Sequence, residues 1–328
     1  MIRIGLVGIG AGAAAALLFA SVISGSLLSM VLFYLAPLPM MIAALGWSHW
    51  AALIGALAGA LALSVAFGSL FFFAFLAIAG LPGWWLGYLA MLARAAPAGG
   101  NGGQPPLEWY PPGRLAMWAA LLAALTVLTG ILYVGDAASL RAALHDMLTQ
   151  VLRAETAEPN GPLIVPGIAN AERLIEFLVQ AIPPAVAVLA TITNLLNLWL
   201  AGRIVKFSGR LARPWPDLAA MTFPRPLPAV LAIAVGLSLV GGLVGILASV
   251  LAAALVMAFG VLGLAVLHAV TQGINARGWL LGGVYAAVLV IGWPVLALCL
   301  LGLIETLAGV RARVARLRPP SLPPPAHS

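Results

Sequence analysis

The chain has 328 residues, of which 63% are hydrophobic and only 8% are charged, and its mean hydropathy is +1.11. A soluble chain would carry about a quarter charged residues, so the composition excludes an ordinary soluble protein. The formal net charge is +7, from 16 Lys and Arg against 9 Asp and Glu. These cations stand at segment ends and in loops, with no basic face interleaved with aromatic residues, so we expect no nucleic-acid partner.

The run from Ile4 to Ala93 contains no Asp, Glu, Lys or Arg, and only His49 could take up a proton near neutral pH. About 20 apolar residues cross a hydrocarbon core, and a charge at its centre costs about 2.5–3.5 kcal/mol. The run therefore predicts about four membrane spans. We interpret the first as an uncleaved helix, because it is longer than the 7–15 apolar residues typical of a signal peptide and further apolar segments follow.

Apolar windows along the whole chain predict about nine spans. They are Ile4–Ser24, Leu27–Trp47, Ala51–Ser69, Phe71–Ala93, Leu115–Val134, Ile182–Ile204, Leu227–Leu247, Val250–Thr271 and Trp279–Leu307. The second contains Pro37 and Pro39, which remove backbone hydrogen bonds, so we expect it to be kinked or locally unwound. The predicted fold class is all-α: a polytopic transmembrane bundle of about eight or nine membrane segments with one amphipathic extramembrane helix.

Small residues recur at every fourth position of the first span and predict a close helix–helix contact. This stripe consists of Gly8, Gly12, Ala16 and Ala20, and Gly55 and Gly59 repeat the spacing in the third span. Two interpretations stay open. The stripe packs within the chain, or it docks on a partner subunit.

Two connections are long. Residues 95–113 are rich in Gly and Pro and predict a structureless linker in which Trp109 and Tyr110 anchor at the membrane interface. Residues 136–177 are acidic, and their first part predicts an amphipathic helix. Its apolar face would hold Leu140, Leu144, Met147, Leu148, Val151 and Leu152. After a turn at residues 160–162, Asn170 is a candidate N-cap, and Pro183-Pro184 should kink the helix that follows.

Thr191, Asn194 and Asn197 follow at three-residue intervals in the sixth span and share one helix face. Polar amides in lipid are costly unless they are paired or line a cavity, so this face is the candidate polar site. It either joins helices or contacts a small neutral solute. His268 and Gln272 form a second i,i+4 pair near the end of the eighth span, with either a structural role or one in proton or ligand handling.

Basic residues cluster between Arg203 and Arg225 and again from Arg311 to Arg318. The positive-inside rule predicts both clusters, and the amino terminus, on the cytoplasmic side of a bacterial inner membrane, with the acidic loop outside. An even number of crossings must then separate Arg225 from Arg311, whereas the apolar windows predict three. Glu305 is interpreted as a charge at the end of the last span that reaches toward the interface.

The chain divides into four parts by composition: membrane helices in 1–134, the acidic loop in 135–177, further membrane helices in 178–310, and a basic, Pro-rich, disordered tail in 311–328. We expect no enzyme, cofactor or metal site. The sequence has no phosphate-binding GxxxxGK loop, no paired intramembrane Asp, no HExxH helix and no nucleophile elbow. The single Cys299 lies in an apolar stretch and is expected to be buried.

The segment Ala36-Pro37-Leu38-Pro39-Met40, followed by the helix of Gly55 and Gly59, resembles the second and third helices of substrate-binding (S) components of energy-coupling-factor vitamin transporters. Over its whole length the chain is similar to the YybS-like family of uncharacterised bacterial membrane proteins. The likeness extends to residues 263–268 and 301–305, where Glu305 replaces the usual Asp. The resemblance implies a multi-helix inner-membrane protein whose small-residue stripe docks on a transporter coupling subunit. It implies no ligand.

Two hypotheses of function follow. The first is a small-solute binding or transport-related subunit in the lipid bilayer, without its own ATPase. The alternative is a non-transport scaffold or regulator that recruits envelope proteins through the acidic loop and the basic tail.

Overall fold

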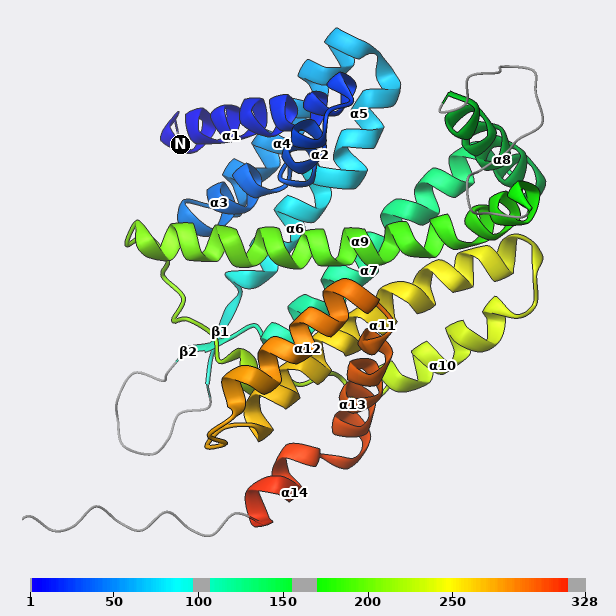
Figure 1. Cartoon of the computed structure of the whole chain (residues 1–328). Helices are drawn as coiled ribbons and strands as arrows, with labels where there is room; N and C mark the ends of the chain where they lie inside the picture. The colour runs from blue at the N-terminus through cyan, green and yellow to red at the C-terminus, as the bar shows by residue number, and fades with distance from the viewer. Residues whose placement is uncertain (1, 97–106, 155–169, 318–328) are drawn as a thin grey trace, which may run out of the picture.

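The computed structural model describes residues 2–96, 107–154 and 170–317. Seven helical stretches in this part of the chain are long and apolar enough to cross a membrane. An eighth is obtained if α13 and α14, which bend by 74° where they meet, form one broken span. The predicted all-α polytopic bundle is confirmed (Figure 1). The predicted turn at residues 160–162 and the last part of the Pro-rich tail, 318–328, lie outside the described residues. The first part of that tail, 311–317, was predicted to be disordered but is helical.

The amino-terminal part is built from short, closely packed helices. They are α1 (Ile2–Ala20), η1 (Ser21–Ser24), α2 (Leu27–Tyr34), α3 (Leu38–Gly46), α4 (His49–Phe67), α5 (Ser69–Phe75), the π-helical turn η2 (Leu76–Gly80) and α6 (Leu81–Ala90). The predicted interruption of the second span is confirmed, since α2 ends and α3 begins on either side of Pro37. A core of mainly Ala and Phe side chains packs α1, α3, α4 and α5 together. The small side chains let these helices approach closely, which favours association in lipid, where no hydrophobic driving force brings helices together.

The linker prediction for residues 95–113 needs correction at its two ends. Strands β1 (Ala93–Ala95) and β2 (Leu107–Trp109) pair antiparallel, with Arg94 opposite Glu108. These two side chains form an exposed ion pair at 2.8 Å, one of the cross-strand pairings that stabilise a short ladder.

The middle of the chain forms two long helices and one amphipathic helix: α7 (Pro112–Val134), α8 (Ala137–Ala154) and α9 (Ala171–Phe207). With 37 residues, α9 is about 55 Å long, which exceeds a hydrocarbon core of about 30 Å. Its first turns lie beside α8 at the edge of the molecule (Figure 1). The N-cap prediction is confirmed, since Oδ1 of Asn170 accepts from the amide of Arg173 at 3.0 Å. Pro183 and Pro184 lie inside α9 without ending it.

The carboxy-terminal part consists of η3 (Leu218–Ala220), α10 (Leu227–Ser238), α11 (Gly242–Val270), α12 (Arg277–Ile291), α13 (Pro294–Ala308) and α14 (Val310–Leu317). Two predicted spans are wrong here. Gly241 and Gly292 adopt φ of +80°, a left-handed conformation that ends a helix, so Leu227–Leu247 and Trp279–Leu307 are each divided. The 12-residue α10 measures about 18 Å and is too short to cross alone.

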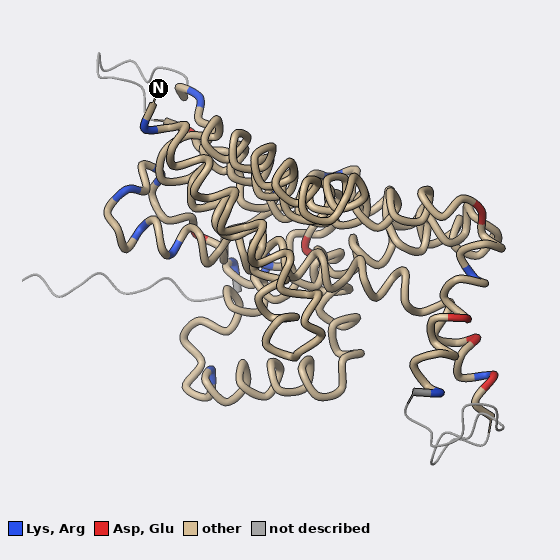
Figure 2. Tube along the Cα trace, turned by 90° about the horizontal axis from the view of Figure 1, so that it is seen from above, with Lys and Arg blue, Asp and Glu red and all other residues tan. Residues whose placement is uncertain are grey.

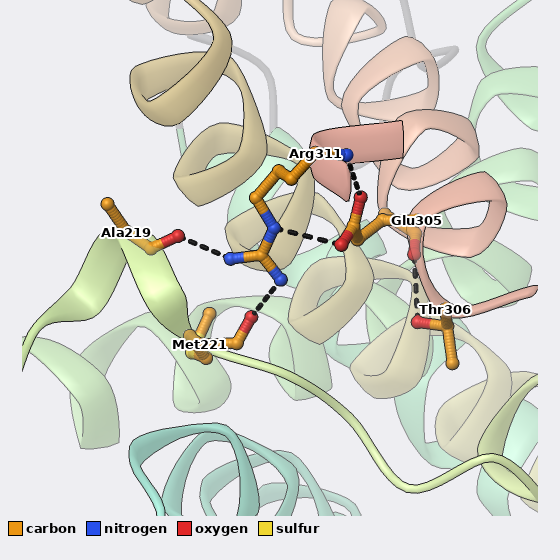
Figure 3. A network of polar contacts seen from close by, with 6 residues as sticks. Ala219, Met221, Glu305, Thr306 and Arg311 are labelled. Carbon is orange, nitrogen blue, oxygen red and sulfur yellow. Dashed lines mark hydrogen bonds and ion pairs between the residues drawn. The ribbon is translucent and has the colours of Figure 1, made fainter. Parts of the chain in front are cut away.

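The two basic clusters meet in the fold. The guanidinium of Arg311 donates to the carbonyls of Ala219 and Met221, which lie in the connection after α9, and to the carboxylate of Glu305 at 2.9 Å (Figure 3). The chain between Arg225 and Arg311 therefore leaves this end of the bundle and returns to it, as the charge distribution requires. Glu305 is 10% exposed and ion-paired, so the prediction of a charge reaching toward the interface is wrong.

Charge is separated along the molecule. In Figure 2, blue Lys and Arg segments gather at the end that carries the amino terminus, while most red Asp and Glu segments gather at the opposite end, near α8. This separation is the one expected for a polytopic bundle oriented by its basic connections.

Candidate functional site

A cavity of about 520 Å³ lies between α2, α5, η2, α7, α8 and α9. Its volume falls within the range of about 300–1,000 Å³ that is typical of small-molecule sites. The lining consists of Phe33, Tyr34, Pro37, Leu70, Phe73, Ala74, Ala77, Ile78, Thr126, Val127, Thr129, Gly130, Ile131, Tyr133, Leu140, Leu144, Ile182, Pro183, Val186, Leu189, Ala190, Thr193 and Asn194. None of these side chains is charged at neutral pH, so the cavity suits a neutral molecule.

Three helix irregularities converge on this cavity. The break between α2 and α3 contributes Tyr34 and Pro37, the π-helical turn contributes Ala77, and α9 contributes Pro183. A proline inside a helix leaves the carbonyl four residues earlier without its helical donor, and π-helical turns occur frequently at functional sites. Such irregularities of three neighbouring helices are costly in a membrane bundle, where backbone groups away from water must be satisfied internally.

The π-helical turn is tied to α7 by a side chain that the sequence analysis did not single out. Oγ1 of Thr126 donates toward the carbonyl of Ala77 at 2.7 Å and lies 2.9 Å from that of Leu122 in its own helix. The widened turn leaves a carbonyl free of regular helical bonding, and Thr126 satisfies it. A Thr in an apolar helix is common, so its spacing alone gives no signal.

Asn194 lies in the cavity wall and is 4% exposed. Its Nδ2 donates to the carbonyl of Ala119 in α7 at 3.1 Å, and no described group donates to its Oδ1. An acceptor in a largely apolar wall can orient a ligand that carries a hydroxyl or amide.

The two other polar residues of this helix face have different surroundings. Nδ2 of Asn197 donates at 2.8 Å to the carbonyl of Tyr34, the last residue of α2, and to that of Thr193. Its Oδ1 is buried without a hydrogen bond from the part of the chain that the structure describes. Thr191 is fully buried and donates to the carbonyl of Ala187 in its own helix. Neither residue lines the cavity, so Asn197 supports its rim and Thr191 packs behind it.

The amphipathic helix α8 covers one side of the cavity. Leu140 and Leu144 belong to the lining, whereas Met147 and Val151, which were predicted on the same face, are about half exposed. Nε2 of His145 lies 2.8 Å from Oε1 of Glu172 at the start of α9, and this hydrogen bond raises the pKa of His145 above its usual value. This contact joins α8 to α9, the helix that carries Asn194.

His268 and Gln272 lie apart from this cavity, at the join between α11 and α12. Nδ1 of His268 lies 2.9 Å from the carbonyl of Leu264, and its Nε2 lies 3.3 Å from the hydroxyl of Tyr285. Gln272 is exposed in the turn that follows. Within the described ranges no group of three or more His, Cys, Asp or Glu could hold a metal ion.

The small-residue stripe lies between two helices of the same chain. A Cβ added at Gly8 would lie 2.6 Å from the carbonyl oxygen of Ala51, and one at Gly59 would lie 2.8 Å from that of Gly12. Gly12 and Gly55 approach so closely that neither accommodates a side chain. Ala16 is buried in the same core and Ala20 is half-buried, so the stripe is occupied by α4.

A second hollow, of about 600 Å³, lies at the turn between α1 and α2 and is lined by four serines. The hydroxyls of Ser21 and Ser29 donate to backbone carbonyls, and that of Ser26 accepts from the amide of Ser29 as an N-cap. Three of the four are therefore engaged in shaping the turn. We favour the cavity beside α9 as the candidate site, because Asn194 leaves an acceptor available in its wall.

Comparison with known proteins places the chain in one family. A family model described as "Predicted membrane protein (DUF2232)" matches residues 13–306, which include every helix that lines the cavity. No curated protein and no solved structure matches the chain.

Proposed function

The chain belongs to the DUF2232 family of predicted membrane proteins, and we propose that it binds a small neutral solute in the cavity beside α9, as a solute-binding or transport-related subunit. The observation that carries the proposal is the convergence of three helix irregularities on one largely apolar cavity with an acceptor in its wall: the break between α2 and α3, the π-helical turn, and the proline inside α9. Interrupted helices around a site near the middle of a bundle are typical of transport proteins.

The lining favours a mostly apolar ligand with one or two polar groups. A charged ligand would lose its hydration without an opposite charge among the lining residues. The hydroxyl of Thr193 and the amide oxygen of Asn194 are the groups that would orient it. We propose no catalytic reaction and no cofactor, since the lining holds no nucleophile–base pair.

Coupling to ATP hydrolysis would require another protein, because the sequence contains no phosphate-binding loop. A coupling subunit, as the S-component likeness implies, would meet a face of α1 other than the stripe. Gly5 and Gly10 have open space around them, and Ile2 and Leu6 are largely exposed. We further propose a bacterial inner-membrane location with the basic end of the bundle in the cytoplasm.

Purification from native membranes, followed by denaturation and mass spectrometry of released small molecules, tests the proposal. Ala190 lines the cavity and Ala185 is exposed on the same helix, so Ala190→Phe and Ala185→Phe form a matched pair. We expect a co-purifying molecule that the first variant loses and the second retains. The absence of any such molecule from the wild type, or its equal retention by both variants, would contradict the proposal.

A scaffold function remains the second candidate because α8 projects from the bundle with Met147 and Val151 exposed between charged residues. A cysteine at the exposed position Ser139, carrying a photo-crosslinker, distinguishes the two functions. A scaffold yields defined protein adducts there that do not change in Ala190→Phe, whereas a solute binder yields none that depend on α8.

A further inference from the structure

A group of basic and aromatic side chains at the carboxyl end of α9 is not used by the cavity. Arg203 lies over the rings of Trp199 and Trp215, at 5.8 and 5.5 Å from their centroids, and Lys206 lies 5.2 Å from the centroid of Trp215. Arg210 lies 4.3 Å from the ring centroid of Trp47. We name these six residues the basic–aromatic patch. Two cations share the ring of Trp215, so their charges lie close together.

The cations of the basic–aromatic patch have no carboxylate partner among the residues that the structure describes. Arg203, Lys206 and Arg210 are exposed and form no ion pair there. The nearest acid in the connection, Asp217, already accepts from the amide of Ala219 at 2.9 Å. The carboxyl end of α9 carries the negative pole of its helix dipole, which by itself repels an anion. The attraction of this surface for an anion therefore comes from the side chains of Arg203, Lys206 and Arg210.

The connection that carries Trp215 is fixed to the bundle. Arg213 is 8% exposed and donates through its two terminal nitrogens to the carbonyls of Ala90 and Tyr110, both at 2.9 Å. Trp215 follows two residues later and is half-buried. The ring of Trp215 is therefore held in a fixed position, where Arg203 and Lys206 contact it.

The surroundings identify the depth of the basic–aromatic patch in the bilayer. Trp47 and Trp199 are 43% and 46% exposed, and half-exposed indoles are typical of the membrane interface, with the apolar ring in lipid and the N–H in water. Phe207, beside Lys206, is 97% exposed and Ile204 is 44% exposed. Apolar side chains next to unpaired cations match an amphiphile with an anionic head and acyl chains.

We propose that the basic–aromatic patch binds the phosphate of an anionic phospholipid headgroup, held by Arg203 and Lys206 on the ring of Trp215, with Arg210 as a further cation. Phe207 and Ile204 contact the acyl chains. The site is independent of the solute cavity.

Native mass spectrometry of the purified full chain in micelles containing equal amounts of phosphatidylglycerol and phosphatidylcholine tests this proposal. The wild type retains phosphatidylglycerol in preference. Arg203→Gln/Lys206→Gln lowers that preference about fivefold for each cation removed. Arg141→Gln/Arg173→Gln removes the same charge from exposed residues at the opposite end and leaves the preference unchanged. An equal loss in the two double variants overturns the proposal.

The position of Trp215 separates a defined site from general attraction between charges. Trp215→Leu keeps every cation but removes their common support, so the preference falls, whereas Trp215→Phe retains it. Trp279→Leu, at a tryptophan that is 89% exposed on α12, is the control for loss of an indole. Unchanged preference in Trp215→Leu overturns the proposed site. Displacement of the lipid by an equal concentration of glycerol 3-phosphate would also overturn it, since the acyl chains would then contribute nothing to binding.

Discussion

Replacing Arg311 by Met would remove the contact that joins the last helices to the connection after α9 (Figure 3). Its side chain donates three hydrogen bonds, one to Glu305 and one each to the carbonyls of Ala219 and Met221. Met fills a similar volume without a donor. The variant therefore leaves two carbonyls without their donor and removes the positive charge beside Glu305, whose Oε2 keeps the bond from the backbone amide of residue 311 at 3.0 Å.

The expected loss of unfolding free energy depends on how deeply the side chains of Arg311 and Glu305 are buried. The side chains of Arg311 and Glu305 are 16% and 10% exposed, so water replaces the lost donors poorly. Removing one partner of a buried ion pair costs about 3–5 kcal/mol, mostly because the remaining charge is left uncompensated. Glu305→Gln should cost less, since Arg311 keeps both carbonyls. The double variant Arg311→Met/Glu305→Gln should cost less than the sum of the two single changes, by about 0.5–3 kcal/mol of coupling.

Unfolding in mixed micelles of increasing SDS content, followed by tryptophan fluorescence, measures these free energies. Arg94→Met is the control because Arg94 and Glu108 form an ion pair at the same 2.8–2.9 Å separation with side chains that are 78% and 50% exposed. An exposed pair contributes little, so this variant should unfold like the wild type. A loss below about 1 kcal/mol in Arg311→Met, or strict additivity in the double variant, would refute the reasoning.

Three further predictions concern the helix contacts. Gly12→Leu should destabilise the bundle by more than about 3 kcal/mol, because a Cβ at this position has no room against α4. Gly10→Leu should be tolerated, because no atom lies within 4 Å of a Cβ placed there, and unfolding in SDS compares the two variants. Because Glu172 raises the pKa of His145 above 6.5, the contact of α8 with α9 should be fully formed below pH 6.5 and weaken as the pH rises through the raised value. Hydrogen exchange of α8 measures this change, and His145→Gln should abolish it. Thr126→Val should lower the free energy of unfolding by about 0.5–1.5 kcal/mol, since a half-buried carbonyl of the π-helical turn loses its donor; an unchanged unfolding midpoint would argue against that bond.

Features that depend on local chemistry could be predicted from the sequence. Pro37 and Pro39 indicated the break in the second span, and Asn170 indicated the start of α9, because a missing N–H and a capping carbonyl act within a few residues. The face of Asn194 and Asn197 was also apparent, since polar amides are costly in lipid wherever they occur.

Other features depend on backbone conformation or on distant contacts. An apolar window depends only on the hydropathy of its residues and not on backbone conformation. The positive φ of Gly241 and Gly292, which ends a helix at each position, was therefore missed in the predicted spans Leu227–Leu247 and Trp279–Leu307. The π-helical turn depends on Thr126 from another helix, and the pairing of Glu305 depends on where α14 returns. The cavity combines six elements, and its existence follows from their packing rather than from any one segment.

The bond between Asn197 and the carbonyl of Tyr34 links residues that are 163 positions apart. At a synthesis rate of about 5–20 residues per second, the second membrane segment emerges roughly 8–33 s before the side chain that completes its end. During that interval, the insertion machinery or water must hydrogen-bond this carbonyl. The end of α2 therefore reaches its final hydrogen bonding only after α9 has been made.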